Sequence, residues 1–451
     1  MADMKSKKIG LITSSVTLAI LVFFALWTID RDVLSSRHQY GLINFSIAFV
    51  LLAAHMAANI LASIKLPKIS GYILAGILAG PFVGGILTHE MVGRLKLIDD
   101  LALSFIALAA GGALHINSLK SRWRIISYNI GLQTLIVFGL VLCFSLLWGY
   151  FFPFLGADSW KSLIVFSMLL GTAAIARSPS STMAIISECK ASGPFTETVL
   201  GVTVSIDVLV IVFFTIILTL SKAIMSGTGG IEPQVFIALS TEIVVSFAIG
   251  VVFGKIITVY IQRIKKDLPL FLLFIAFGVT KTSAWLTFFM ENHFHIHFAI
   301  EPLLICISAG FTVQNFSREG AFFEDSLEKV SLPIYVLFFS VAGAALNMDA
   351  LLVCWPFALY IALVRIGGIF IATYTAGRIN GDSAERNKNA WMAYLTQAGV
   401  AIGLAQIAER QFPEIGTYLT TVVLAVISIN QVAGPITFKL ALSNVCEAFD
   451  D

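Results

Sequence analysis

Long apolar segments separated by short polar loops recur along almost the whole chain. A helix needs about 17 to 25 mostly apolar residues to cross the hydrocarbon core of a bilayer, and the segments have this length. They predict about fourteen membrane-spanning helices: 9–29, 40–63, 69–88, 97–116, 124–152, 161–187, 196–221, 234–261, 268–290, 298–314, 330–347, 353–377, 388–409 and 416–442. We therefore expect an all-α, polytopic membrane protein.

Composition strengthens this prediction. Hydrophobic residues make up 58% of the chain, charged residues make up 12% and the mean hydropathy is +0.90, whereas soluble domains carry about 25% charged residues. A formal net charge of +2 gives no reason to expect a nucleic-acid partner. The five cysteines lack the spacing of a disulfide framework or a metal site, so we expect no cofactor and no resident metal.

The chain ends and loop charges predict an orientation. The first segment, 9–29, follows Lys5, Lys7 and Lys8, and its length without a cleavage site before Asp30 favours an anchoring helix over a signal peptide. The loops on the same side as this end hold most of the lysines and arginines, which places both termini in the cytoplasm. We expect an integral, multi-pass membrane protein.

Two pairs of similar segments indicate an internal repeat. Ala110–Leu119 (AGGALHINSL) matches Ala342–Leu351 (AGAALNMDAL), and the Ser-Ile-Asp that ends at Asp207 matches the Ser-Ile-Asn that ends at Asn430. The halves would each hold about seven spans, and an odd number makes the two copies run in opposite directions. This inverted-repeat plan is typical of secondary transporters, whose sites lie near the midplane where the repeats meet.

A lone carboxylate, Asp207, lies almost midway along segment 196–221. Acids inside a membrane are costly and are usually functional, so Asp207 is suited to hold a proton or a cation; the alternative is a structural acid locked in an ion pair. Thr203 precedes it by one helical turn and faces the same way. Its hydroxyl either ligates the cation or bonds its own helix carbonyl.

Polar residues interrupt the preceding segment: Arg177, Ser178, Pro179, Ser180, Ser181 and Thr182. Because Pro179 removes a backbone donor, we expect the helix to break there, with freed carbonyls and hydroxyls lining a cavity. An ordinary proline kink satisfied by the serines is the alternative. Arg177 and Asp207 stand at similar depth, so they could face each other.

Further polar residues lie deep in the later segments. Arg365 is the midpoint of 353–377 and keeps its charge, so it either pairs with a buried acid or shapes the site as a fixed cation. Thr396 and Gln397 interrupt segment 388–409, as expected if it mirrors the broken helix at Pro179. Lys281 stays ambiguous. The sequence holds no P-loop, H-E-x-x-H, G-x-S-x-G or G-x-G-x-x-G motif, so we do not expect an enzyme.

Several blocks together resemble the monovalent cation:proton antiporter superfamily, the sodium/hydrogen exchangers and their bacterial relatives without a C-terminal nucleotide-binding regulatory domain. Leu66–Pro81 and Leu332–Gly343 resemble two signature blocks of the family. Ala176–Pro179 falls on its T-D-P or T-S-P crossover, Asp207 falls on its N-D or D-D motif, and the segment around Arg365 resembles the helix that carries its buried basic residue.

The resemblance implies roles for these residues. Asp207 would be the proton and cation carrier, with Ser178 and Thr203 as ligands and Arg365 as the buried basic partner. Ile206 replaces the Asn or Asp of the family before the carrier acid, and this single acid implies electroneutral one-for-one exchange. Arg177 replaces the usual Thr, and a cation beside Asp207 would compete with Na⁺ or K⁺.

The resemblance also implies a bacterial inner (plasma) membrane, a domain plan and a mechanism. We expect an extra helix in 1–35, a transmembrane domain in 36–443 and a short cytoplasmic tail in 444–451. A core (120–222 and 350–443), with crossed broken helices, would move against a scaffold and dimer interface (36–119 and 262–349), so that Na⁺ or K⁺ and H⁺ compete for one carboxylate in an elevator-type antiporter. Two alternatives remain: the same fold carrying an anion or organic acid, and a non-transporting sensor or assembly subunit.

Overall fold

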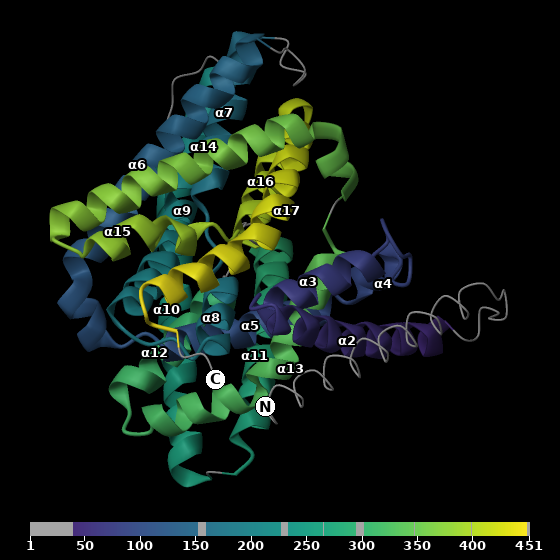
Figure 1. Ribbon diagram of the computed structural model, residues 1–451, viewed down its shortest axis with the longest axis vertical. Coiled ribbons are helices and arrows are strands. Elements are labelled where there is room, and N and C mark those ends of the chain that lie inside the picture. The colour runs from purple at the N-terminus through teal and green to yellow at the C-terminus, as the bar shows by residue number, and fades with distance from the viewer. Residues whose placement is uncertain are drawn as a thin grey trace. The chain divides into compact units, whose positions relative to one another are not determined.

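The computed structural model describes residues 39–151, 159–226, 233–264, 266–294, 302–346, 348–397 and 399–448. Within these ranges the regular structure is helical and no strand occurs (Figure 1). The predicted helix 9–29 lies outside the described residues, as do the last three residues of the predicted tail. The prediction of an all-α chain is therefore confirmed for the part that the structure describes.

The chain divides into two compact units. The first unit comprises residues up to 103 and residues 329–348. It holds α2 (Gln39–Ser63), α3 (Lys68–Ala79), α4 (His89–Arg94), the first turns of α5 (Lys96–Gly112) and most of α13 (Gly320–Ala344). Helix α2 packs against α3. The core of this first unit includes an apolar cluster of Phe49, Val50, Ala53, Ala79, Leu87 and Ala344.

The predicted helix 69–88 is shorter in the structure and ends at Ala79. Gly80 is extended, with φ −69° and ψ 172°, because the following Pro81 disfavours a helical conformation in the residue before it. The chain then turns back, and the Leu87 amide donates to the Ala79 carbonyl at 2.8 Å. Proline chemistry, which the hydropathy pattern does not report, thus sets this boundary.

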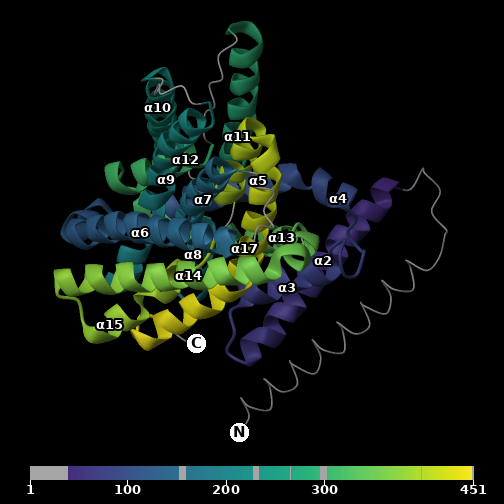
Figure 2. The ribbon, with the colours of Figure 1, turned by 90° about the horizontal axis from the view of Figure 1, so that it is seen from above.

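The second unit contains the other helices: α6 (Ile116–Phe151), α7 (Trp160–Ile175), α8 (Pro179–Glu188), α9 (Pro194–Ser226), α10 (Pro233–Arg263), α11 (Leu268–Phe294), α12 (Pro302–Phe316), α14 (Met348–Asn380), α15 (Ala384–Asn389), the 3₁₀ helix η2 (Ala390–Tyr394), α16 (Gly399–Gln411) and α17 (Pro413–Asn444). Helices α6, α7 and α9 pack on one another, and α17 packs on α16, η2 and α7. Helix α14 lies beside α6 (Figure 2), and the Tyr360 hydroxyl of α14 donates to the Phe144 carbonyl of α6 at 3.3 Å.

Eight helices of the described chain are long and apolar enough to cross a membrane, judged by length and composition: Leu119–Phe151, Trp160–Glu188, Pro194–Met225, Thr241–Arg263, Leu268–Met290, Gly320–Ala344, Leu351–Asn380 and Pro413–Asn444. Four shorter apolar helices accompany them: Ala48–Ser63, Lys68–Ala79, Leu101–Gly112 and Pro302–Phe316. The helices therefore have the lengths and composition of a multi-pass membrane protein.

Two helix pairs approach so closely that only glycine fits between them. In the second unit, a Cβ at Gly111 of α5 would overlap the Ile307 carbonyl of α12, and a Cβ at Gly310 would overlap the Leu108 carbonyl. Small residues let backbones touch in this way in membrane proteins. In the first unit, Gly76 of α3 meets the Ser340 carbonyl of α13, and Gly343 meets the Ile73 carbonyl.

The residues after α17 fold back onto the start of α9. The carboxylate of Glu447, which is only 6% exposed, accepts from the amides of Phe195 and Thr196 at 2.8 Å each and from the Thr196 hydroxyl at 2.9 Å. Its charge lies 3.5 Å from the Arg386 guanidinium. This carboxylate therefore caps the positive end of α9, which favours an anion.

We expect Glu447→Ala to destabilise the protein by about 2 to 3 kcal/mol, because it leaves two amides and Arg386 without their buried acceptor. The measurement is the unfolding temperature in detergent. Glu414→Ala, which removes an exposed glutamate from the first turn of α17, is the matched control and should leave the temperature unchanged. Equal effects of the two substitutions would contradict the capping role.

Candidate functional site

The helix that contains Pro179 is broken, as the sequence predicts. Helix α7 ends at Ile175, the chain is extended at Ala176 and Ser178, and α8 begins at Pro179. The Ser178 hydroxyl accepts from the Ser181 amide at 3.2 Å and bonds the hydroxyls of Ser180 and Ser181 at 3.1 and 2.9 Å. Ser178 thus caps the start of α8, and the hydroxyls of Ser180 and Ser181 bond to it. Proline suits the first helical turn because a backbone N–H at that position would have no acceptor within the helix.

A second break lies where Thr396 and Gln397 were predicted to interrupt their helix. The 3₁₀ helix η2 ends at Tyr394, residues 395–397 are not helical, and α16 begins at Gly399. The Gln397 side chain donates to the Ala173 carbonyl at 3.1 Å and accepts from the Asn430 amide at 2.7 Å. Gln397 therefore joins the second break to the last turn of α7 and to α17.

Arg365 connects the two breaks. It is fully buried, and its Nε donates to the Ala174 carbonyl at 2.8 Å. Its two terminal nitrogens donate to Ala176, Leu395 and Tyr394 carbonyls at 2.9 to 3.4 Å. These carbonyls belong to the ends of α7 and η2, where backbone acceptors are left over and the helix dipole is negative. The positively charged Arg365 side chain therefore bonds to both interrupted helices.

Arg177 is also buried, with 1% of its side chain exposed. One terminal nitrogen donates to the Ala174 and Ala176 carbonyls at 3.1 Å, and the other donates to Gln133 Oε1 of α6 at 3.0 Å. Gln133 in turn donates to Asn129 Oδ1 at 3.4 Å. These hydrogen bonds connect the end of α7 with α6. That Arg177 faces Asp207 stays a prediction.

Asp207 and Thr203 lie on α9, with 6% and 1% of their side chains exposed. Helix α9 contacts α7 and α8 of the first break and η2 and α16 of the second. The hydroxyls of Thr203, Thr182 and Thr396 are buried without a hydrogen-bond partner among the described residues. A buried unsatisfied hydroxyl needs an explanation, and an exchanging ligand is one.

Sequence reasoning missed the amide pair of Asn129 and Gln133. Both are buried in α6, with exposed fractions of 4% and 0%. The available signal was two amides four residues apart, on one face of an otherwise apolar helix. Lys281, which sequence left ambiguous, is exposed, and its ammonium lies 5.9 Å from the Phe277 ring.

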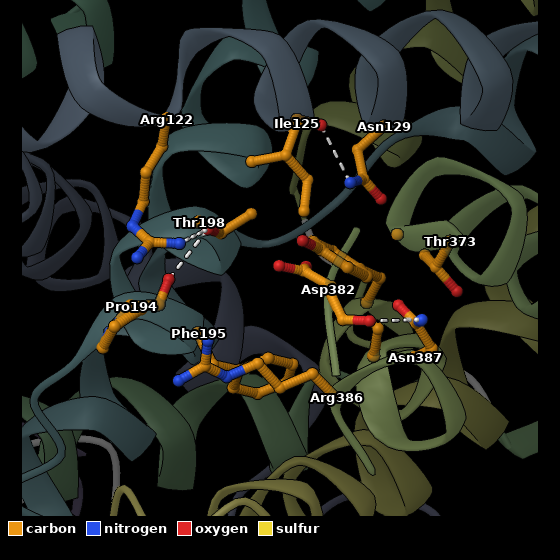
Figure 3. A pocket seen from close by; sticks show the side chains of 13 residues that line it. Arg122, Ile125, Asn129, Pro194, Phe195, Thr198, Thr373, Asp382, Arg386 and Asn387 are labelled. Carbon is orange, nitrogen blue, oxygen red and sulfur yellow. Dashed lines mark hydrogen bonds between the residues drawn. The ribbon is translucent and has the colours of Figure 1, made fainter. Parts of the chain in front are cut away.

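A pocket in the second unit adjoins this site (Figure 3). Arg122 at its edge is 3.4 Å from the Glu197 carboxylate and 3.5 Å from the Thr198 hydroxyl. Helices α6, α9, α14 and α15, η2 and the turn before α15 supply its lining: Arg122, Ile125, Asn129, Pro194, Phe195, Thr198, Thr373, Gly377, Asp382, Arg386, Asn387, Ala390 and Tyr394. No motif or spacing in the sequence groups these residues.

Solved structures share this fold. The sodium proton antiporter MjNhaP1 from Methanocaldococcus jannaschii, in a structure at pH 8, is 16% identical with a TM-score of 0.62, covering 90% of this chain and 97% of that one. An electron-microscopy map of the same antiporter gives 17% identity and a TM-score of 0.65, covering 91% and 96%. No curated protein matches the chain.

The family comparison covers most of the chain. The model of the family described as sodium/hydrogen exchanger, transmembrane, matches residues 45–442. This range includes both breaks, Asp207 and Arg365. The members are integral, multi-pass membrane transporters that exchange cations for protons, and they are not enzymes. This chain belongs to the sodium/hydrogen exchanger family.

Proposed function

We propose that this protein exchanges a monovalent alkali cation, Na⁺ or K⁺, for H⁺, and that both bind in turn at Asp207. One observation carries the proposal: a buried carboxylate on a helix that contacts both interrupted helices. Such a carboxylate holds one positive charge at a time, so cation and proton compete. That competition is what couples their movements in opposite directions.

Oxygen ligands for the cation are available on the same elements. Thr203 lies one turn before Asp207, and its hydroxyl has no partner among the described residues. Ser178 holds its hydroxyl at the start of α8, where it caps the helix, and would share an oxygen lone pair with the cation. Hydroxyl and carboxylate oxygens suit alkali cations. Arg365 would act as a positioning residue that holds the breaks in register.

We expect Thr203→Val to raise the cation concentration at half-maximal exchange about tenfold, a change of about 1.4 kcal/mol, because it removes one ligand and keeps the shape. Thr215→Val on the same helix is the matched control. The Thr215 hydroxyl bonds the Ile211 carbonyl of its own helix at 3.0 Å, so its loss should leave cation dependence unchanged. An identical effect of both variants would remove Thr203 from the ligand set.

The glycine contacts support the proposed inverted repeats of about seven spans each. Gly111 and Gly343 occupy equivalent places in the two matching segments, and each touches a helix carbonyl of the other proposed half. We extend the proposal to alternating access by an elevator movement, with a core of 120–222 and 350–443. The scaffold of 36–119 and 262–349 would form a homodimer. A bacterial inner membrane and cytoplasmic termini complete the proposal.

The first alternative, transport of an anion or organic acid, rests on the buried arginines. Both of them donate to backbone carbonyls at the breaks through most of their nitrogens, and Arg177 Nε is the one nitrogen of the two guanidinium groups that has no acceptor among the described residues. This observation favours a cation at the site. The second alternative, a non-transporting subunit, predicts no flux and a stability loss on changing Arg177 or Asp207 alone that the double variant relieves.

The deciding experiment is dissipation of a preset pH gradient in proteoliposomes, with sodium, potassium and lithium salts added in turn. Exchange predicts a cation-dependent collapse of the gradient that saturates with concentration. Choline salts with the same anions serve as controls. A gradient that collapses with particular anions and ignores the alkali cation would favour the anion alternative, and no collapse with any salt would favour the non-transporting subunit.

A further inference from the structure

Two buried arginines share their acceptors at the first break. The Ala174 carbonyl accepts from Arg177 at 3.1 Å and from Arg365 at 2.8 Å. The Ala176 carbonyl accepts from the same two side chains at 3.1 and 3.3 Å. Two guanidinium groups that bond the same oxygens lie close together, and like charges repel strongly where little water screens them. Each arginine therefore depends on its other acceptors to stay in place.

Gln133 of α6 is the acceptor that Arg177 does not share with Arg365. Its Oε1 accepts from the second terminal nitrogen of Arg177 at 3.0 Å, whereas Arg365 bonds the Leu395 and Tyr394 carbonyls besides the shared pair. Gln133 is fully buried, so bulk solvent does not compete with this bond. The third nitrogen of Arg177, Nε, has no acceptor among the described residues. Gln133 therefore anchors the Arg177 guanidinium to α6.

Asn129 fixes the orientation of the Gln133 amide. The Ile125 carbonyl can only accept, and Asn129 Nδ2 donates to it at 2.9 Å (Figure 3). Asn129 Oδ1 is left to accept from Gln133 Nε2, at 3.4 Å. Arg177 can only donate, so it requires Oε1 at the other side of the same amide. Both ends of this chain of bonds agree, and exchanging the O and N of Gln133 would break two of them.

The position of the Arg177 charge matters because of its place at the crossover. Arg177 lies in the break between α7 and α8, and α9, which carries Asp207, contacts both of these helices. Arg177 is therefore a cation tethered to elements that pack on the proposed carrier helix. A guanidinium binds a carboxylate well, so Arg177 is able to compete with sodium or a proton for Asp207 if it leaves α6.

We propose that Gln133 is a positioning residue, which holds the Arg177 guanidinium on α6 and so keeps it from competing with the transported cation for Asp207. The proposal rests on the antiport function proposed above, and Asn129 supports the role by orienting Gln133. A tethered competitor reduces the fraction of protein that is competent to bind the cation. Its release therefore lowers the apparent cation affinity and leaves the rate at saturating cation unchanged.

The test is the sodium dependence of exchange in proteoliposomes. Gln133→Met removes the acceptor with a flexible side chain of similar length. We expect it to raise the half-saturating sodium concentration about tenfold, the effect of losing one bond to a charged group, with the maximal rate retained. Asn129→Leu should raise it about threefold, since Gln133 keeps its oxygen and loses its orientation. Ser145→Ala is the matched control on α6, because the Ser145 hydroxyl bonds the Leu142 carbonyl of its own helix at 3.2 Å. It should change neither quantity.

Removing Arg177 separates competition from structure. In Gln133→Met combined with Arg177→Met, apolar groups replace both the donor and its acceptor, a change that is often nearly neutral for stability. The Ala174 and Ala176 carbonyls keep Arg365 as a donor. We expect the double variant to recover the sodium affinity of the unchanged protein. A purely structural role of Gln133 would leave the double variant at the affinity of Gln133→Met or below it.

Sodium binding is also measured without transport, as the rise of the unfolding temperature in detergent with added sodium chloride, against choline chloride as the reference. The midpoint of this rise should move to about tenfold higher sodium in Gln133→Met and return in the double variant. Should Gln133→Met not fold, Asn129→Leu with and without Arg177→Met decides the same question.

Each outcome decides a different point. An unchanged sodium midpoint in Gln133→Met, a lowered maximal rate alone, or a double variant that does not recover would overturn the positioning role and leave the antiport function standing. Loss of alkali-cation exchange in the unchanged protein would instead reject the antiport function, and the positioning role with it. A sodium midpoint that rises with Gln133→Met and recovers with Arg177→Met would establish the role.

Discussion

Replacing Asp207 with asparagine should reduce cation/proton exchange to the background of protein-free vesicles. The amide has nearly the same shape as the carboxylate but carries no negative charge and does not exchange a proton in the physiological range, so neither substrate can bind as proposed. The measurement is the pH-gradient assay with saturating sodium or potassium. The cation-binding step is lost, and not merely weakened, because the proposed site has a single acid.

The same substitution should leave the protein folded. Asp207 is 6% exposed, and replacing a buried charge with a neutral polar group removes a desolvation cost. We expect an unchanged or higher unfolding temperature in detergent. Asp267→Asn is the matched control, since Asp267 is exposed in a turn with φ 48°, which asparagine tolerates. It should transport normally.

The pair of variants discriminates between the proposed functions. Full activity of Asp207→Asn would reject the carrier role, even if the protein is an exchanger. Loss of activity together with loss of folding would point to a structural ion pair, and the double variant with Arg177 would then recover stability. Inactivity with intact folding, beside an active Asp267→Asn, is the result expected of a carrier.

The local chemistry of the first break was predictable from sequence. Pro179 lacks an N–H and cannot continue a helix, and the serines around it have side chains that cap helix starts. The second break has no proline. Gly399, Gln397 and Thr396 weaken that helix only modestly, so the prediction of a break depended on the proposed repeat. The structure confirms the break.

The hydrogen bonds that join the two breaks were not predictable in the same way. Arg365 was identified as buried and basic, but its acceptors are backbone carbonyls separated from it by 29 to 191 residues along the chain. Backbone acceptors carry no sequence signal, because every residue has one. The same reason hid the capping of α9 by Glu447, because this carboxylate accepts from the backbone amides of Phe195 and Thr196, which lie 252 and 251 residues earlier in the chain.

Arg365 bonds to both breaks, and we expect its replacement to reduce the amount of folded protein strongly. Arg365→Met keeps much of the side-chain volume but leaves the carbonyls of Ala174, Ala176, Tyr394 and Leu395 without this donor. The Ala174 and Ala176 carbonyls keep Arg177 as a donor, but the Tyr394 and Leu395 carbonyls lose a charged donor, and each buried acceptor left without a partner costs about 1 to 3 kcal/mol. We expect most of the protein to be lost as aggregate in detergent size-exclusion chromatography.

Arg365→Lys distinguishes geometry from charge. Lysine keeps the positive charge but concentrates its three donors at one nitrogen, whereas the arginine uses three nitrogens to reach both breaks. We expect this variant to fold with a lowered unfolding temperature and to exchange cations at least about tenfold more slowly, a barrier increase of about 1.4 kcal/mol, because the two interrupted helices are no longer held in register.

Arg378→Met supplies the control on the same helix, since Arg378 lies in the last turn of α14 and is exposed. It should fold and transport like the unchanged protein. Normal transport by Arg365→Lys would show that the charge alone suffices, and that the crossover does not depend on a planar group with several nitrogens. A stable, monodisperse Arg365→Met would go further, because the breaks would then be held by Gln397 and by packing without any contribution from this arginine.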